Sequence, residues 1–100
     1  MRISLFAPLI NPENDAAYLK ALAIGAEERG FHAIWVGEHV VLFDEYEAQY
    51  PYTEDGRIPI GGERSLLEPM TALTFLAAHS KKIRLGTGIC LVPQRNPVYT

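Results

Sequence analysis

Residues 31–37 read FHAIWVG, and their side chains are almost all apolar. A strand with one wet face alternates polar and apolar residues, whereas a strand that is covered on both faces shows a continuous apolar run. Strands of the second kind belong to parallel sheets that carry helices on their faces. The run therefore predicts a buried strand in a protein of the α/β class.

Strand-like and helical segments alternate on either side of this run. Residues 2–7 predict a first strand, which Pro8 ends. Residues 16–29 predict a helix, because apolar residues recur there at steps of three and four. Residues 70–80 predict a second helix, and residues 83–89 predict a third strand. The order strand, helix, strand, helix, strand predicts parallel strands joined by right-handed crossovers.

Individual residues predict where the two helices begin and end. Gly30 follows the charged pair Glu28-Arg29, a position that favours a left-handed glycine just past a helix. Pro69 directly precedes the second helical run, and proline suits the first turn of a helix because the N–H that it lacks has no partner there. Residues 11–15 form a turn cluster that offers capping side chains to the first helix.

A long segment without a periodic pattern, residues 38–64, separates the second strand from the second helix. Loops of this length in a compact domain are usually functional or disordered. The segment contains Tyr46, Tyr50 and Tyr52, and such aromatic residues favour an ordered, functional loop. These tyrosines either wall a substrate pocket or pack the loop down onto the protein.

Composition and charge exclude several classes of function. The 100-residue chain has 48% hydrophobic and 21% charged residues, as soluble globular proteins do. Its net charge of −3, with no cluster of Lys and Arg, argues against a nucleic-acid partner. No apolar run reaches the roughly 18 residues of a membrane helix, and no signal-peptide pattern is present. Because Cys90 is the single cysteine, we expect a cytoplasmic protein without an internal disulfide.

Chemically active side chains follow the second predicted strand. In parallel α/β folds, ligands bind at the C-terminal ends of the strands, where loops converge. Glu38 and His39 occupy such an end, and an imidazole exchanges protons near neutral pH, which suits general acid–base catalysis. The alternative is an ordinary loop histidine that is hydrogen-bonded to backbone. His32 and His79 lie away from such ends, and we interpret both as structural.

The third predicted strand contains the glycine pattern Gly86-Thr87-Gly88, which imitates the start of a dinucleotide-binding fingerprint. The match fails at Leu91, where the last glycine should stand, so a Rossmann-type site is not predicted. The glycines instead permit close approach of backbone to a flat ligand, or form a bulge at a barrel rim. Arg95, in the predicted loop 92–97, either grips a phosphate or carboxylate or is solvated. The spacing of His and Cys predicts no metal site, and no nucleophile elbow is present.

Several stretches, taken together, resemble the luciferase-like monooxygenase family. Residues 30–40, GFHAIWVGEHV, are similar to the second strand of that family and the His that follows it. Residues 83–89 and 95–97 resemble its third strand and the loop after it. Residues 50–57 and 67–71 resemble the subgroup that uses the deazaflavin coenzyme F420.

The resemblance implies a fold and a chemistry. The fold would be a TIM-like (β/α)8 barrel, of which residues 1–100 would be the N-terminal βαβαβ portion of a single, apparently incomplete domain. The cofactor would be F420, and the reaction would be hydride transfer between F420 and a small organic substrate. The alternative is an FMN-dependent monooxygenase of the same family.

The resemblance also implies roles for particular residues. His39 matches the family's histidine near the ring and the substrate, so it is the candidate catalytic residue. Glu38 matches a neighbouring polar residue that contacts the cofactor. Gly88, Ile89 and Cys90 would lie beside the ring, because relatives often have a non-proline cis peptide at the position of Gly88–Ile89. Such a bond costs about 3–4 kcal/mol and needs surrounding structure to hold it. We expect His39 and this strand end to open onto the same mouth.

Two other interpretations stay open. Three strands and two helices alone would expose an unpaired strand edge and an apolar face, so we expect a homo-oligomer or a place within a longer chain. The chain would then be a non-catalytic, self-associating barrel fragment. An unrelated barrel enzyme such as an aldolase would need a lysine at a strand end, and Lys81 and Lys82 both precede the third strand.

Overall fold

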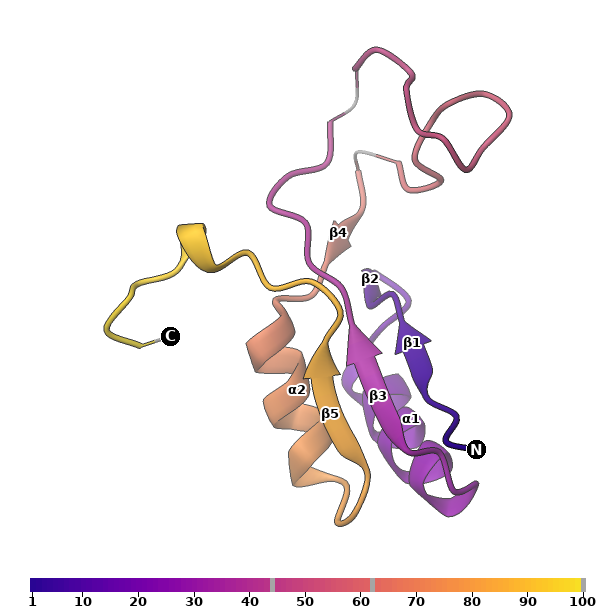
Figure 1. The fold of residues 1–100 in the computed structure, drawn as a ribbon, viewed down its shortest axis with the longest axis vertical. Helices are drawn as coiled ribbons and strands as arrows, with labels where there is room; N and C mark the ends of the chain where they lie inside the picture. The colour runs from indigo at the N-terminus through magenta and orange to yellow at the C-terminus, as the bar shows by residue number, and fades with distance from the viewer. Residues whose placement is uncertain (44, 62, 100) are drawn as a thin grey trace.

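The computed structural model describes residues 1–43, 45–61 and 63–99. Along the chain, the elements are β1 (Leu5–Ala7), β2 (Ile10–Asn11), α1 (Ala16–Glu28), β3 (Ala33–Val36), β4 (Ser65–Leu66), α2 (Pro69–Ala78), β5 (Arg84–Thr87) and the 3-10 helix η1 (Val92–Gln94). The long segment between β3 and β4 rises above the C-terminal ends of β1, β3 and β5 (Figure 1).

Strands β1, β3 and β5 form a parallel sheet, with β3 in the middle. The register pairs Leu5 with Ile34, and Ile34 with Leu85. Helix α1 connects β1 to β3, and α2 connects β3 to β5, so the predicted parallel βαβ units are confirmed. Both helices lie on the same side of this sheet (Figure 1). We call the opposite side, which carries Phe6 and Trp35, the open face.

The hydrophobic core lies between the sheet and the two helices. Ile34 and Val36 of β3 are fully buried in one cluster with Leu19 of α1 and Leu76 of α2. Burial of a side chain of this size contributes roughly 1.5–3 kcal/mol to stability. Trp35, between the two buried residues, belongs to the open face and remains 42% exposed. The continuous apolar run in the sequence therefore has one face in the core and one face free.

Helix α1 begins and ends near the predicted residues. The Asp15 side chain accepts a hydrogen bond from the Tyr18 N–H at 2.7 Å and so caps the first turn. The helix ends at Glu28, one residue earlier than predicted. Gly30 has a φ of +74°, which confirms the left-handed glycine expected just past the helix.

Helix α2 begins at Pro69, which confirms that proline occupies its first turn. The N-cap is Glu68, whose carboxylate accepts a hydrogen bond from the Thr71 N–H at 2.7 Å. The helix ends at Ala78, before the predicted end at Ser80. The Ser80 hydroxyl instead donates to a carbonyl of the last turn at 2.9 Å, which satisfies one of the free acceptors there.

The antiparallel pairing of β2 with β4 was not predicted from the sequence. Ile10 pairs with Leu66, and Asn11 pairs with Ser65. These strands are too short to show an alternating pattern, and they join segments 54 residues apart. The single helical turn η1 also lies within a segment predicted as a loop. The β2–β4 pair joins the end of the long loop to the segment that follows β1, and so holds the loop near the C-terminal ends of the parallel strands.

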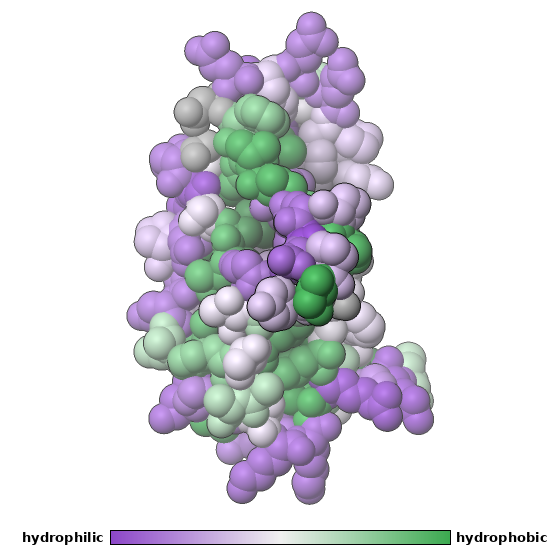
Figure 2. Space-filling model, turned by 90° about the vertical axis from the view of Figure 1, so that its left-hand side faces the viewer, coloured by the Kyte–Doolittle hydropathy of each residue, from purple (hydrophilic) through white to green (hydrophobic). Residues whose placement is uncertain are grey.

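Apolar side chains are exposed on two surfaces of the molecule. On the open face, Phe6 is 60% exposed beside Trp35. On the α2 side, apolar side chains lie between polar upper and lower ends (Figure 2). Small monomeric proteins rarely expose large contiguous apolar patches, so both surfaces suit packing against further protein. No helix in the described parts of the chain is long and apolar enough to cross a membrane.

Candidate active site

The C-terminal ends of the three parallel strands meet at one edge of the sheet, next to the long loop (Figure 1). A cavity of about 240 Å³ lies there. Its lining comes from the strand ends, the long loop and β4, and comprises Phe6, Pro8, Gly37, Glu38, His39, Tyr50, Ile58, Pro59, Ile60, Leu66 and Ile89. The structure thus places His39 and Ile89, which follow different strands, in the lining of one cavity.

His39 lies just past the end of β3, and its side chain is exposed. The imidazole makes no hydrogen bond to any residue in the described parts of the chain. The histidine bonded to backbone, which was the alternative from the sequence, is therefore not what the structure shows. Both ring nitrogens are available for proton exchange with a bound molecule.

Glycines allow the aromatic rings of the open face to lie close against the sheet. The Phe6 ring is so near Gly37 and Gly88 that a Cβ added at either glycine would be 3.1 Å from it. The Trp35 ring covers Gly86, where an added Cβ would be 2.6 Å from a ring carbon. The glycine pattern at the end of β5 is therefore explained by close ring packing.

Ile89 lines the cavity and is 52% exposed. The predicted cis peptide between Gly88 and Ile89 is wrong, because the cis bond among the described residues is Asn11–Pro12. The Gly88 N–H donates to the Val36 carbonyl at 2.8 Å and continues the pairing of β5 with β3. The exposed Ile89 side chain lacks the packing that would hold so costly a bond. Of the residues proposed beside the ring, Gly88 contacts Phe6 and does not line the cavity.

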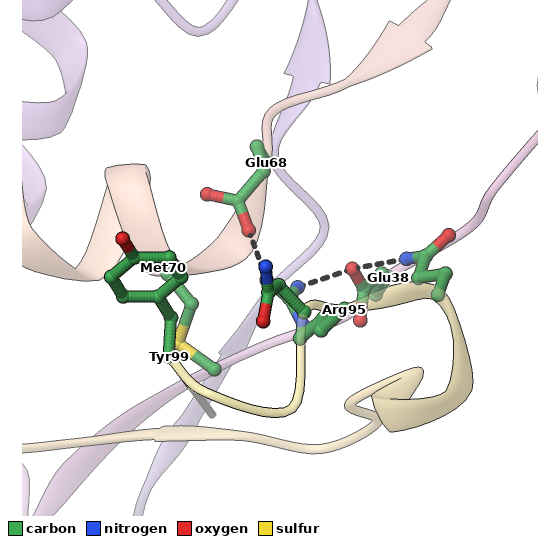
Figure 3. Close-up of a pocket in the computed structure, with 7 residues that line it drawn as sticks. Glu38, Glu68, Met70, Arg95 and Tyr99 are labelled. Atoms are coloured by element: carbon green, nitrogen blue, oxygen red, sulfur yellow. Dashed lines mark hydrogen bonds and ion pairs between the residues drawn. The ribbon is translucent and has the colours of Figure 1, made fainter.

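Glu38 is a buried carboxylate, with 6% of the residue exposed. Its Oε2 accepts a hydrogen bond from the Leu91 N–H at 2.6 Å, and its Oε1 accepts one from Gln94 Nε2 at 2.7 Å. The Arg95 guanidinium forms an ion pair with the same Oε1 (Figure 3). Glu38 therefore binds the loop that follows β5, in addition to lining the cavity beside His39.

Arg95 bridges two carboxylates from different parts of the chain. Its Nη1 donates to Glu68 Oε1 at 2.9 Å, while its Nη2 pairs with Glu38 (Figure 3). The pair of Arg95 and Glu38 is largely shielded from water, because their side chains are 16% and 5% exposed, whereas the Glu68 side chain is 47% exposed. The sequence left two alternatives for Arg95: that it binds a phosphate or carboxylate, or that its side chain is solvated. The structure shows instead that Arg95 binds carboxylates of the protein itself.

The contacts of this cluster keep two of its groups charged. Burial raises the pKa of Glu68, but hydrogen bonds from Thr71 and Arg95 outweigh burial and lower that pKa to about 2. The Glu68 carboxylate in turn raises the pKa of Arg95 above its ordinary value, with smaller contributions from Cys90 and Glu38. Cys90, proposed to lie beside the ring, is thus placed next to Arg95. Glu68 and Arg95 therefore carry opposite full charges at neutral pH.

Sequence reasoning did not single out Glu68 or Gln94. The signal for Glu68 was its position directly before Pro69, where an acceptor caps the helix. No local signal marks Gln94, because its role depends on how the loop after β5 folds back onto β3. A second cavity, of about 450 Å³, lies beside the cluster (Figure 3). Its lining is Glu38, Glu68, Met70, Gln94, Arg95, Asn96 and Tyr99.

The long loop forms one wall of the first cavity. The Ile58 N–H donates to the Tyr46 hydroxyl at 2.7 Å, and the Arg57 guanidinium lies 5.7 Å from the centre of the Tyr46 ring. Tyr50 and Tyr52 pack edge to face, with their ring centres 5.4 Å apart. The interpretations apply to different tyrosines: Tyr50 lines the cavity and Tyr46 holds the loop, whereas Tyr52 is 83% exposed and contacts Tyr50.

The other two histidines lie away from the cavity. The His79 ring stacks on Phe75 with the ring centres 4.5 Å apart, and its Nδ1 is 2.9 Å from the Phe75 carbonyl oxygen. The His32 carbonyl accepts a hydrogen bond from the Arg84 N–H at 3.2 Å, at the opposite end of the sheet. The ring contacts of His79 agree with a structural role, and His32 lies at the end of the sheet away from the cavity.

The lining of the cavity fits a flat ring better than an anionic group. Phe6 belongs both to the lining and to the open face, where the aromatic rings give a broad apolar surface. Neither Lys nor Arg is among the described lining residues, so the residues present do not supply a cation for a phosphate. The described residues also contain no group of His, Cys, Asp and Glu that could hold a metal ion.

Comparisons with known proteins agree on one family. The family model described as luciferase-like monooxygenase matches residues 1–100. The uncharacterized proteins Rv0953c and MT0980 of Mycobacterium tuberculosis and Mb0978c of Mycobacterium bovis are each 30% identical to the chain over 73 residues. These residues make up 73% of this chain, but the chain spans only 26% of the length of each of these relatives. No solved structure matches the chain significantly.

Proposed function

Because this chain belongs to the luciferase-like monooxygenase family, we propose that it is the N-terminal βαβαβ portion of a (β/α)8-barrel oxidoreductase. The family consists of flavin-dependent oxidoreductases and monooxygenases with a TIM-barrel fold. In such barrels the active site lies at the C-terminal ends of the strands. The observation that carries the proposal is the cavity at this edge, which His39 and Ile89 line from two different strand ends.

The cofactor in this proposal is F420, with FMN as the alternative, and the substrate is a small organic molecule. Members of the family use FMN or F420. The stretches at 50–57 and 67–71, which resemble the F420-dependent subgroup, favour F420. The bound ring would supply the hydride chemistry. Its contacts would come from Glu38, His39 and Ile89, which line the cavity.

The residues of this chain would bind and orient the ring and the substrate, and one of them would transfer a proton. Phe6 and Ile89 give the cavity apolar walls, which would shield the reacting atoms from water once the rest of the barrel covers them. His39 would hold or move the proton that accompanies hydride transfer, since its ring makes no hydrogen bond to the described residues. Glu38 would act beside it by fixing the loop after β5.

Cofactor binding by the full-length protein tests this proposal. Purified protein is titrated with F420 and, separately, with FMN, and binding is followed by the absorbance of each cofactor. We expect saturable binding of at least one, and tighter binding of F420. A protein that binds neither cofactor contradicts the proposed function.

A His39→Ala variant tests the assignment of the proton-transfer group. General acid–base catalysis typically contributes about 10²–10⁴-fold, so we expect turnover to fall by that factor while cofactor binding and fold persist. Turnover is measured by cofactor absorbance in a screen of small alcohols, aldehydes and enones. His32→Gln, at the other end of the same strand, is the matched control. Wild-type turnover by His39→Ala would remove His39 from the mechanism.

A non-catalytic, self-associating barrel fragment is the second candidate, and the exposure of Phe6 and Trp35 on the open face favours it. In the first proposal the same surfaces would pack against the rest of the barrel or against other copies in a homo-oligomer. A stable monomer of the 100-residue chain in sedimentation would contradict the self-associating fragment. Oligomers are expected in both cases, so binding of F420 or FMN by the full-length protein decides between them.

A further inference from the structure

Arg95 connects three segments that lie far apart in the chain. Glu38 follows β3, Glu68 caps α2, and Arg95 itself lies in the loop after β5. Its Nη2 contacts the Glu38 carboxylate, and its Nη1 contacts the Glu68 carboxylate (Figure 3). One guanidinium therefore ties the loop after β5 to the end of β3 and to the start of α2 at the same time.

The Glu38 carboxylate also binds a backbone N–H near the cavity. The same side chain that pairs with Arg95 also accepts the Leu91 N–H at 2.6 Å. Leu91 follows closely after Ile89, which lines the cavity together with His39. The orientation of the Glu38 carboxylate therefore determines where the turn that carries Ile89 can lie.

Glu38 depends on the guanidinium to hold this arrangement, whereas Glu68 is also held by the Thr71 N–H as the cap of α2. Glu38 is buried, and a buried carboxylate is unfavourable unless it is paired and hydrogen-bonded. Without Arg95, Glu38 would turn toward water or rearrange, and the loop would lose the hydrogen bond at Leu91. Lysine would keep the positive charge but offers a single point of contact, whereas the planar guanidinium reaches two carboxylates at once.

We propose that Arg95 is a positioning residue, which holds the Glu38 carboxylate in place and thereby fixes the loop of residues 88–95 against the cavity. The role assigned to the cavity rests on the proposed function, but the effect of Arg95 on the loop does not. Arg95 itself does not line that cavity. Its effect on cofactor binding would therefore be indirect, through the position of the loop.

Amide hydrogen exchange of the full-length protein tests the effect on the loop. In Arg95→Gln, we expect exchange in the peptide of residues 88–95 to speed up by about tenfold or more, because the amide of Leu91 loses its acceptor. Arg95→Lys should give an intermediate rate. Arg64→Gln, which removes a more exposed ion pair with Glu13, is the matched control and should leave this peptide unchanged.

Cofactor affinity tests whether the loop matters to the site. We expect the dissociation constant for F420 or FMN to rise up to about a hundredfold in Arg95→Gln, with partial rescue by Arg95→Lys. If Arg95→Gln also speeds up exchange in α2, the fold itself has loosened. Glu68→Gln weakens the cap of α2 and one contact of Arg95 but leaves Arg95 paired with Glu38, so it shows how much of the effect comes from α2. It should give a smaller effect on residues 88–95 in the same direction.

The outcomes separate this proposal from the proposed function. Unchanged exchange of residues 88–95 in Arg95→Gln overturns the positioning role. Faster exchange with unchanged cofactor affinity also overturns it, because the loop would then move without consequence for the site. A wild-type protein that binds neither cofactor contradicts the proposed function, and in that case the order of exchange rates alone decides whether Arg95 fixes the loop.

Discussion

Gly86 lies under the Trp35 ring and decides how closely that ring approaches the sheet. A Cβ in Gly86→Ala would be 2.6 Å from a ring carbon of Trp35, nearer than atoms can approach. The ring would have to move, and overpacking of this kind typically costs about 1–3 kcal/mol. We expect that loss in the free energy of unfolding of the full-length protein, measured by urea denaturation.

A second substitution provides the control for this prediction. In a Trp35→Leu background the clashing ring is absent, so Gly86→Ala should cost much less there. Equal losses in both backgrounds would show that the ring does not set the need for glycine at this position.

At the scale of single residues, the sequence predicted where candidate site residues lie in the fold, but it did not predict which side chains they contact. The rule that ligands bind at the C-terminal ends of parallel strands depends only on the order of elements, so it placed Glu38 and His39 at the cavity edge. The partners of Arg95 could not be predicted in this way. They depend on how the loops after β3 and β5 close over each other, which no local pattern of residues encodes.

At the scale of elements, Glu27 joins α1 to the turn before β5. Its carboxylate accepts hydrogen bonds from the backbone N–H groups of Lys81, Lys82 and Ile83 at 2.8, 2.5 and 2.9 Å. Three N–H donors favour the charged form, so they lower the pKa of Glu27 below its ordinary value of 4.5. This contact fixes the turn between α2 and β5 by a side chain of another helix.

The lowered pKa of Glu27 predicts how stability depends on pH. Because the folded state favours the charged carboxylate, its contribution is fully present above about pH 4.5 and is lost as pH falls through the lower, folded pKa. Glu27→Gln should therefore destabilise the protein at pH 7, and the difference from wild type should shrink below pH 4.5. Thermal unfolding across this pH range measures the difference.

Glu28→Gln provides the matched control for this experiment. Glu28 is the neighbouring residue and is exposed at the end of α1. It should show little difference from wild type at any pH. A Glu27→Gln variant whose deficit stayed constant down to pH 2 would contradict a role for the ionised carboxylate.

The sequence predicted the elements that have a clear period and missed those that depend on distant partners. Helices α1 and α2 and the three parallel strands were found, because apolar periodicity and the capping residues Asp15, Gly30 and Pro69 are local signals. The β2–β4 pair was missed, since two-residue strands have no period and form only when the long loop returns to the sheet. The predicted strands were also longer than the observed ones, although the hydrogen bonds from His32 N–H to the Ile3 carbonyl and from Gly88 N–H to the Val36 carbonyl continue the pairing past the observed ends.

At the scale of the whole molecule, the two exposed apolar surfaces indicate that further protein packs against this chain. The core between the sheet and the helices is complete, but the open face has no cover in the described residues. The chain spans 26% of the length of each mycobacterial relative, and the family fold is a closed barrel. Further strands of such a barrel would pair with the sheet edges and enclose Phe6 and Trp35.

We propose that the strand ends bearing His39 and Ile89 hold one redox ring between them. A crystal structure of the full-length protein with bound F420 or FMN is the sharpest test of this arrangement. We expect the ring to occupy the cavity at the C-terminal edge of the sheet, in contact with both side chains. A ring bound elsewhere, with His39 and Ile89 packed against protein alone, would rule the arrangement out.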